Sequence, residues 1–164
     1  MYPDSAKNLN YETKDAVYWF VTSFQPLDNW SAHTVNIWGK KFLTTEHAYH
    51  YSKYAETAPA IARKIFDAPS PWAAMKIDRQ HAGKRRKDWD KVKISIMTEI
   101  VSAKVVQNED VRQCLLGTGN KQLFENSPWD KFWGCGEDKT GQNHMGKILM
   151  QIRDQLIDKS PSSG

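Results

Sequence analysis

The apolar pattern of the chain changes near residue 44, and this change restricts the fold more than any other feature. Before it, the β-branched and aromatic run Val17–Val21 is typical of a short buried strand. His33–Trp38 alternates and is followed by Gly39-Lys40, which predicts a hairpin. Everything after residue 44 shows helical patterns. The sequence therefore predicts an α+β fold, a mostly helical single domain with a small antiparallel β-sheet near its N-terminus.

Capping and breaking residues divide the second part of the chain into six helices. Thr44 or Thr45 caps the first, and prolines open or separate the next two. The predicted helices cover about residues 45–55, 59–66, 72–81, 87–106, 108–117 and 143–158. Because 164 residues suit one domain and the end is rich in Ser, Pro and Gly, we expect three parts. They are a flexible lead-in over residues 1–16, the domain over 17–158, and a disordered tail over 159–164.

The composition excludes several classes of protein. Hydrophobic residues make up 40% of the chain and charged residues 26%, so we expect a packed core and not wholesale disorder. No apolar run approaches the roughly 18 residues that cross a membrane, and the N-terminus lacks the layout of a signal peptide. Two cysteines without a CxxC spacing do not make a disulfide scaffold. We therefore expect a cytoplasmic protein with no membrane partner.

The first chemically informative segment lies in the first predicted helix. There Glu46, Tyr49, His50 and Lys53 occupy positions i, i+3, i+4 and i+7, hence one face. Taken alone, such a stripe is more typical of ordinary ion pairs on a solvent-exposed surface, because burying unpaired charge is costly. Glu46-His47 with His50 lacks the H-E-x-x-H order, so no metal site is predicted.

A basic run precedes the longest predicted helix, and a tryptophan follows it. The net charge is only +4, yet Lys84–Lys93 holds six of the cations. One interpretation is that this run binds a phosphate-bearing ligand or nucleic acid. The other is that it is a solvated helix start whose positive charge is partly offset by Asp88 and Asp90. Trp89 is either a half-buried anchor or a plate on which a nucleobase stacks.

A loop rich in Gly and Trp, from Asn126 to Gln142, leads into the last predicted helix. It carries Asp130 and Trp133, and the helix start that follows is expected to offer N–H groups to an anion or a hydroxyl. The spacing is neither a P-loop nor G-x-G-x-x-G, so nucleotide kinase or dehydrogenase chemistry is not supported and no cofactor is expected. Cys135 lies between glycines without a paired His signature, so a cysteine nucleophile is not favoured.

Taken together, these segments resemble the YbiA-like family, also called NADAR for its suggested link to NAD and ADP-ribose. The resemblance covers about residues 18–157 in the order of the family. The matching stretches are Pro26–Trp30, Thr44–Tyr54, Arg86–Trp89, Lys104–Asn108, Leu115–Gly119, Glu125–Gly136 and Gly141–Met150.

The resemblance implies an N-glycosidase that acts on ribosides whose C1′ is bonded to nitrogen. Family members are associated with phosphorylated early intermediates of riboflavin synthesis, or with removing ADP-ribose from modified guanine. The acid, the aromatic residue and the second acid of the family fall on Glu46, Trp89 and Asp130, and the helix lysine associated with sugar attack falls on Lys53. The chain departs from the family at His50, where a glutamine is common.

Physical reasoning agrees with this implication. Cleavage of an N-glycosidic bond builds positive charge on C1′ and the ring oxygen, which a carboxylate stabilises while the same or another one orients water. We expect Glu46 and Asp130 to be these two carboxylates. Lys53 has two possible roles that the sequence leaves open. As an ammonium it holds a phosphate or pairs with Glu46, and as an amine it attacks the open-sugar aldehyde to form a Schiff base.

The remaining predicted site residues bind the substrate. Trp89 stacks on the base or the sugar, Arg86 makes a bidentate phosphate contact, and His50 lies between the charged groups of its helix. Asn143 hydrogen-bonds ribose hydroxyls or positions the second acid. Trp133, with the adjacent Gly134, walls the pocket.

The predicted function is hydrolysis of the C1′–N bond of a phosphorylated riboside. The riboside is a riboflavin-biosynthesis intermediate or an ADP-ribosyl adduct on a nucleobase, either free or in modified nucleic acid. One alternative is a non-catalytic module that binds NAD or ADP-ribose in the same pocket. Another is a structural nucleic-acid-binding protein built on the basic run, whose affinity for DNA would depend steeply on salt.

Overall fold

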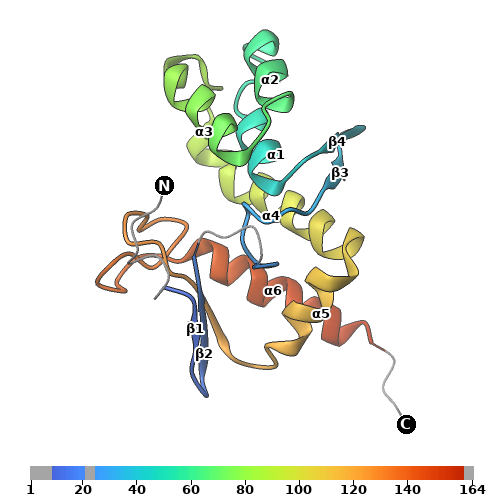
Figure 1. The fold of residues 1–164 in the computed structure, drawn as a ribbon, viewed down its shortest axis with the longest axis vertical. Helices are drawn as coiled ribbons and strands as arrows, with labels where there is room; N and C mark the ends of the chain where they lie inside the picture. The colour runs from blue at the N-terminus through green and yellow to red at the C-terminus, as the bar shows by residue number, and fades with distance from the viewer. Residues whose placement is uncertain (1–8, 21–24, 161–164) are drawn as a thin grey trace. The chain divides into compact units, whose positions relative to one another are not determined.

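The computed structural model describes residues 9–20 and 25–160. The chain forms two compact units, drawn together in Figure 1. The first unit combines the stretch that ends at Asp28 with the stretch that begins at Glu109. The second unit is continuous and runs from Asn29 to Asn108.

The first unit contains a three-stranded sheet in the order β1-β2-β5. Its strands are β1 (Tyr11–Glu12), β2 (Ala16–Trp19) and β5 (Gln122–Glu125). β1 and β2 are antiparallel, whereas β2 and β5 are parallel, with Val17 opposite Leu123. The buried run predicted from Val17 is thus confirmed as a strand, although its last residue, Val21, lies outside the described residues.

Strand β5 differs from the expectation that everything after residue 44 is helical. Its four residues are too few to show a period of two, and only Leu123 among them is buried. The segment is extended because it pairs with β2, more than 100 residues earlier in the chain. A short strand fixed by so distant a partner carries little local signal.

Two helices complete the first unit, α5 (Glu109–Gly117) and α6 (His144–Asp158). α6 packs against both β5 and α5 through an apolar stripe. The buried apolar residues of this stripe are Met145, Ile148, Leu149 and Ile152. Helix α6 begins one residue after Asn143, which adopts the left-handed conformation with φ 53°.

The second unit opens with the predicted hairpin. β3 (Val35–Ile37) pairs antiparallel with β4 (Lys40–Phe42), with Val35 opposite Phe42. The two turn residues Trp38 and Gly39 have φ of 54° and 72°, the positive values of a type I′ turn, whose twist matches the strands. The prediction of a small antiparallel sheet near the N-terminus is therefore confirmed.

Four helices and one 3₁₀ turn fill the rest of the second unit. They are α1 (Thr45–Ser52), α2 (Pro59–Phe66), α3 (Pro71–Gln80), η2 (Ala82–Lys84) and α4 (Trp89–Gln107). Thr44 caps α1 and Ser70 caps α3 by accepting hydrogen bonds from backbone N–H groups, while prolines occupy the first turns of α2 and α3. These termini agree with the sequence prediction to within a few residues.

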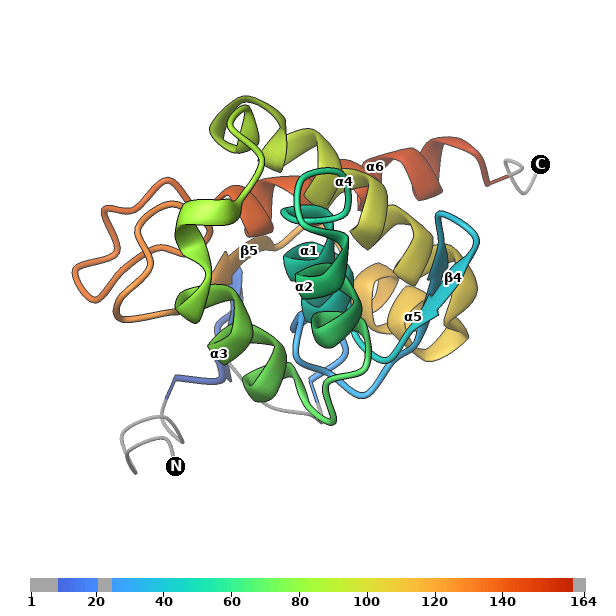
Figure 2. The ribbon, with the colours of Figure 1, turned by 90° about the horizontal axis from the view of Figure 1, so that it is seen from above.

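Helix α1 lies at the centre of the second unit. It packs against α2, α3, α4 and the hairpin, and Figures 1 and 2 show it among these elements. Two apolar clusters lie around it, one joining α1 to α2 and α3, and the other joining it to the hairpin and α4. Because neighbours cover α1 on several sides, six of its eight residues are buried, including charged ones.

The mostly helical α+β class is thus confirmed, with six α-helices in the described part of the chain. Strand β1 falls within the stretch predicted to be a flexible lead-in, and the tail beyond residue 160 lies outside the described residues. Among the helices that the structure describes, none is both long enough and apolar enough to span a bilayer.

Candidate active site

The polar stripe of α1 is buried. Glu46 is 9% exposed, and His50 and Lys53 are each 4% exposed. The interpretation of this stripe as a solvent-exposed set of ion pairs is therefore wrong. The physical reason is that α2, α3 and α4 cover the helix, which no pattern within its own eight residues discloses.

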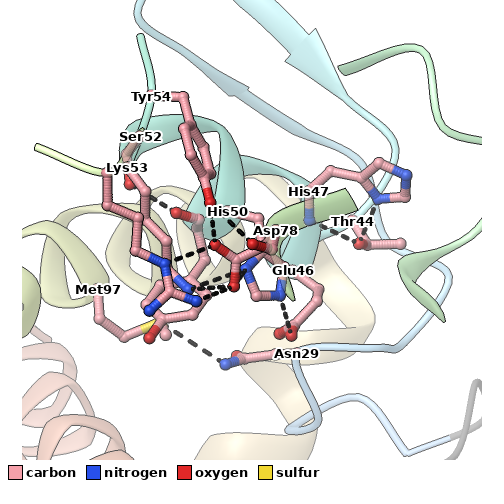
Figure 3. A network of polar contacts seen from close by, with 12 residues as sticks. Asn29, Thr44, Glu46, His47, His50, Ser52, Lys53, Tyr54, Asp78 and Met97 are labelled. Carbon is pink, nitrogen blue, oxygen red and sulfur yellow. Dashed lines mark hydrogen bonds and ion pairs between the residues drawn. The ribbon is translucent and has the colours of Figure 1, made fainter. Parts of the chain in front are cut away.

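The buried residues of the stripe form a continuous hydrogen-bonded chain, shown in Figure 3. His50 Nε2 lies 2.8 Å from Glu46 Oε1, and Lys53 Nζ lies 3.0 Å from His50 Nδ1. Because the carboxylate accepts, Nε2 carries a hydrogen, and in the neutral ring Nδ1 accepts from the Lys53 ammonium. The predicted order, with His50 between Glu46 and Lys53 on one face, is thus confirmed.

A second acid closes the other end of this chain. Asp78, from α3, is 2% exposed, and its Oδ2 lies 2.9 Å from Lys53 Nζ. Arg85 donates to both of its oxygens, at 2.8 and 2.6 Å, and the Tyr54 hydroxyl donates to Oδ1 at 2.7 Å. Asp78 is not among the site residues predicted from the sequence. Its only signal is the i+4 spacing from the buried Ala74, which places a carboxylate on the inner face of α3.

The electrostatics keep both acids ionised. Burial alone would raise the pKa of Glu46, but the adjacent His50, the charge of Lys53 and a hydrogen bond from Trp30 hold it below its ordinary value. For Asp78, too, burial would raise the pKa. The adjacent His50, the hydrogen bonds from Arg85 and the charge of Lys53 instead hold it well below its ordinary range. Burial lowers the pKa of Lys53, and Asp78 opposes that change.

Two aromatic rings lie beside the Lys53 ammonium. Its Nζ is 4.4 Å from the ring centroid of Tyr49 and 5.5 Å from that of Trp89. The two rings contact each other, with centroids 5.3 Å apart. Trp89 is only 7% exposed, so it is a buried wall of the cluster. The structure thus brings four predicted site residues together: Glu46, His50, Lys53 and Trp89.

A second aromatic pair adjoins the Glu46 end of the cluster. The indole of Trp30 hydrogen-bonds the Glu46 carboxylate, and its ring centroid lies 6.3 Å from that of Trp72. Trp72, near the start of α3, is 47% exposed. The carboxylate therefore lies close to an aromatic surface that reaches solvent.

The basic run divides into buried and exposed parts. Arg85 binds the buried Asp78, whereas Arg86 forms a bidentate pair with the exposed Asp88 at 2.6 and 3.0 Å. The backbone N–H of Arg86 donates to the Lys53 carbonyl at 2.8 Å, which places this residue next to the end of α1. Three further cations of the run are exposed to solvent: Lys84, Lys87 and Lys91.

The other predicted site residues lie in the first unit, in the loop before α6. Asp130 is half-buried, and its Oδ1 accepts from the backbone N–H groups of Phe132 and Trp133, each at 2.8 Å. Trp133 packs edge-on against Phe132, with centroids 4.9 Å apart. At Gly134 an added Cβ would lie 2.7 Å from the Glu125 carbonyl, so only glycine fits there.

The start of α6 differs from the expectation of available N–H groups. Those of Asn143, His144 and Met145 donate to carbonyls of the preceding loop, at 3.0 Å each. The Asn143 side chain is also engaged, since its Nδ2 donates to the Leu123 carbonyl at 2.8 Å and its Oδ1 accepts from the Glu125 N–H at 3.0 Å. This terminus therefore anchors the loop to β5.

The other histidine of α1, His47, hydrogen-bonds to groups within the fold. His47 is buried, with Nδ1 2.8 Å from the Thr44 hydroxyl and Nε2 2.9 Å from the Ala68 carbonyl. Within residues 9–20 and 25–160, no group of three or more His, Cys, Asp or Glu side chains could hold a metal ion.

Known proteins place the chain in a family. The model of the NADAR domain matches residues 11–157. The chain belongs to the NADAR family. An N-glycosidase of Nostoc punctiforme is 39% identical to it over 142 residues, which cover 84% of this chain and 91% of that protein. The family predicted by the resemblance is therefore confirmed.

Other relatives share the domain at lower identity. The N-glycosidase YbiA of Escherichia coli is 28% identical over 157 residues, 94% of this chain and 97% of that protein. A riboflavin biosynthesis protein of Vibrio vulnificus is 30% identical over 90% of this chain, which spans 38% of that longer protein. The NMR structure of E. coli YbiA matches with a TM-score of 0.78 and 24% identity over 97% of both chains, a likeness that concerns the fold alone.

Proposed function

We propose that this NADAR protein is an N-glycosidase that hydrolyses the C1′–N bond of a phosphorylated riboside. One observation carries the proposal: the ionised carboxylate of Glu46, buried in a hydrogen-bonded cluster beside an aromatic surface. The names of the relatives from Nostoc punctiforme and E. coli, both N-glycosidases, support the reaction type.

Glu46 stabilises the charge that develops when the glycosidic bond breaks. The electron pair of the C1′–N bond leaves with the nitrogen, and the sugar becomes an oxocarbenium-like cation. A fixed carboxylate in a water-poor site stabilises such a cation far more than a hydrated one does. Water then adds to C1′, and one of its protons ends on the departing nitrogen, so the products are a free base and a sugar phosphate.

His50 and Lys53 keep this carboxylate in place and ionised. His50 donates to Glu46, and Lys53 in turn holds the other ring nitrogen. We assign Lys53 the ammonium role in the resting enzyme, because its Nζ donates to both His50 and Asp78. Attack on an open-sugar aldehyde would first require Lys53 to lose a proton, which the neighbouring Asp78 carboxylate opposes.

The substrate's phosphate is assigned to the basic run. Arg86 is held beside the end of α1 by its backbone, and its guanidinium already makes a bidentate contact with the Asp88 carboxylate. A phosphate of similar geometry can replace that exposed carboxylate. We assign Trp89 to the wall next to the sugar, since its ring adjoins Lys53.

Asp130 is proposed as the second acid, which orients or deprotonates water. Its support is the family pattern and a loop that fixes its orientation through two backbone N–H groups. Trp133 and Gly134 are proposed as the wall of the same region. Asn143 is proposed to act through the backbone it holds, which anchors the loop to β5.

The proposed substrates are a ribosylamino-pyrimidine phosphate or an ADP-ribosyl adduct on guanine. The test is incubation of the protein with each substrate, followed by chromatography of the products. The proposal predicts equal amounts of free pyrimidine and ribose phosphate from the first substrate, or of unmodified guanine and ADP-ribose from the second. Binding without turnover would favour the alternative, a non-catalytic NAD- or ADP-ribose-binding module, and DNA affinity that falls steeply with salt would favour a nucleic-acid-binding protein.

A matched pair of substitutions tests the second acid. Asp130→Asn removes the proposed base, whereas Asp138→Asn changes an exposed aspartate in the same loop. We expect Asp130→Asn to lower kcat about 100-fold or more, and Asp138→Asn to leave it near wild type. Equal rates for the two variants would remove Asp130 from the mechanism.

A further inference from the structure

Asp78 is a buried charge that the proposed reaction does not use. At 2% exposure its carboxylate is enclosed by three donors from two segments: Lys53 and Tyr54 after α1, and Arg85 after η2. A carboxylate this deeply buried is costly unless each of its lone pairs is satisfied. Here each oxygen accepts at least two hydrogen bonds, since Oδ1 also receives Arg85 Nε and Oδ2 receives Arg85 Nη2.

The charges of the cluster balance only if Asp78 is counted. Glu46 and Asp78 contribute two negative charges, and Lys53 and Arg85 contribute two positive ones. Without Asp78 a single carboxylate, Glu46, would face both cations. The ammonium would then lie next to a like charge, which favours its loss of a proton.

The geometry around Lys53 is fixed on several sides. Asp78 Oδ2 lies 2.9 Å from Nζ and His50 Nδ1 lies 3.0 Å from it, while the rings of Tyr49 and Trp89 adjoin it. His50 Nδ1 is also 3.3 Å from Asp78 Oδ2, so the acid contacts both members of the chain that leads to Glu46.

We propose that Asp78, held by Arg85 and Tyr54, is a positioning residue that keeps Lys53 as a fixed ammonium and thereby orients His50 against Glu46. The catalytic part of this inference rests on the proposed function. Its electrostatic part does not, because it concerns the protein without substrate.

The electrostatic part is tested by NMR titration of the protein labelled with ¹³C at the lysine Cε. The Lys53 resonance is identified as the one missing from Lys53→Arg. The groups that face Lys53 are the carboxylates of Glu46 and Asp78, the imidazole of His50, the guanidinium of Arg85 and the ring face of Tyr49.

The proposal predicts that two substitutions shift the titration midpoint of Lys53 in opposite directions. Asp78→Asn removes a negative charge and lowers the Lys53 midpoint by about 1–3 pH units. Arg85→Gln removes a positive charge and raises it. A general loosening of the fold would move both variants in the same direction, toward the value of an exposed lysine.

Asp78→Glu completes the test of the electrostatic part. Asp78→Glu restores the charge and gives a midpoint closer to wild type than Asp78→Asn. If Asp78→Asn does not fold, Arg85→Lys is compared with Arg85→Gln: the retained charge should keep the midpoint closer to wild type, and equal midpoints in these two variants would overturn the proposal. An unchanged midpoint in Asp78→Asn, or shifts of the same sign in Asp78→Asn and Arg85→Gln, would overturn the proposal.

The catalytic part is read from pH–rate profiles. In Asp78→Asn we expect kcat to fall more than KM changes, and the basic limb to move to lower pH by the shift seen in the titration. An unmoved limb would overturn this part. If the two variants shift the Lys53 midpoint in opposite directions but the wild-type protein shows no glycosidase activity, the electrostatic part stands and the proposed function is refuted.

Discussion

Asn143 offers a test that separates a structural from a substrate-binding role. Its amide makes two hydrogen bonds to β5, and its backbone is left-handed, with φ 53°. Asn143→Ala loses both bonds, at about 1 kcal/mol each, and alanine tolerates the left-handed conformation less well than asparagine, which costs up to about 1 kcal/mol more. We therefore expect a loss of about 2–3 kcal/mol in the free energy of unfolding. Asn143→Gly avoids the backbone term and is expected to lose about 2 kcal/mol.

Urea unfolding followed by tryptophan fluorescence measures both variants. The order wild type, Asn143→Gly, Asn143→Ala is the expected order of decreasing stability. If Asn143→Ala unfolded at the wild-type urea concentration and yet lost activity, Asn143 would act on the substrate and not through the loop it anchors.

Three further predictions follow from burial. Asp78→Asn should destabilise the fold by about 3–5 kcal/mol, because it breaks a buried ion pair. Asp67→Asn, which breaks an exposed pair with Arg63, should cost less than about 1 kcal/mol. Equal melting temperatures for the two variants would contradict a stabilising role of the buried cluster. Burial lowers the pKa of His47 from 6.5. Below about pH 6.5 the unfolded state therefore binds a proton that the native state does not, so the free energy of unfolding decreases as the pH falls. His47→Gln should show a smaller loss of melting temperature between about pH 7 and about pH 5, and an unchanged loss would assign the effect to other groups. Burial also raises the pKa of the Cys135 thiol, so the half-buried Cys114 should react first with a disulfide reagent, and faster reaction of Cys135 would be evidence against a closed loop.

The sequence predicted the features that depend on neighbouring residues. The hairpin was predicted from Gly39-Lys40, although the turn itself is Trp38-Gly39. The start of α1 was predicted from Thr44, and those of α2 and α3 from the prolines beside them. The shared face of Glu46, His50 and Lys53 follows from helical spacing. Each of these depends on residues within a few positions, where a pattern carries full information.

Features that depend on distant parts of the chain were not predictable. The burial of the α1 stripe depends on the helices packed around it, and Asp78 joins Lys53 across 25 positions. Strand β5 exists because it pairs with β2. Likewise, the side chain of Asn143 meets β5 some 20 positions earlier, at Leu123, so its role in holding the loop is not visible locally.

The most direct test of the central claim is the rate of glycosidic cleavage by Glu46→Gln. Glutamine keeps the shape and an acceptor for His50 but removes the charge proposed to stabilise the sugar cation. Glu99→Gln, an exposed change on α4, serves as the control. We expect single-turnover cleavage by Glu46→Gln to be about 100-fold to 10⁴-fold slower than wild type, with Glu99→Gln near the wild-type rate. A folded Glu46→Gln that cleaves the substrate as fast as Glu99→Gln would contradict the claim.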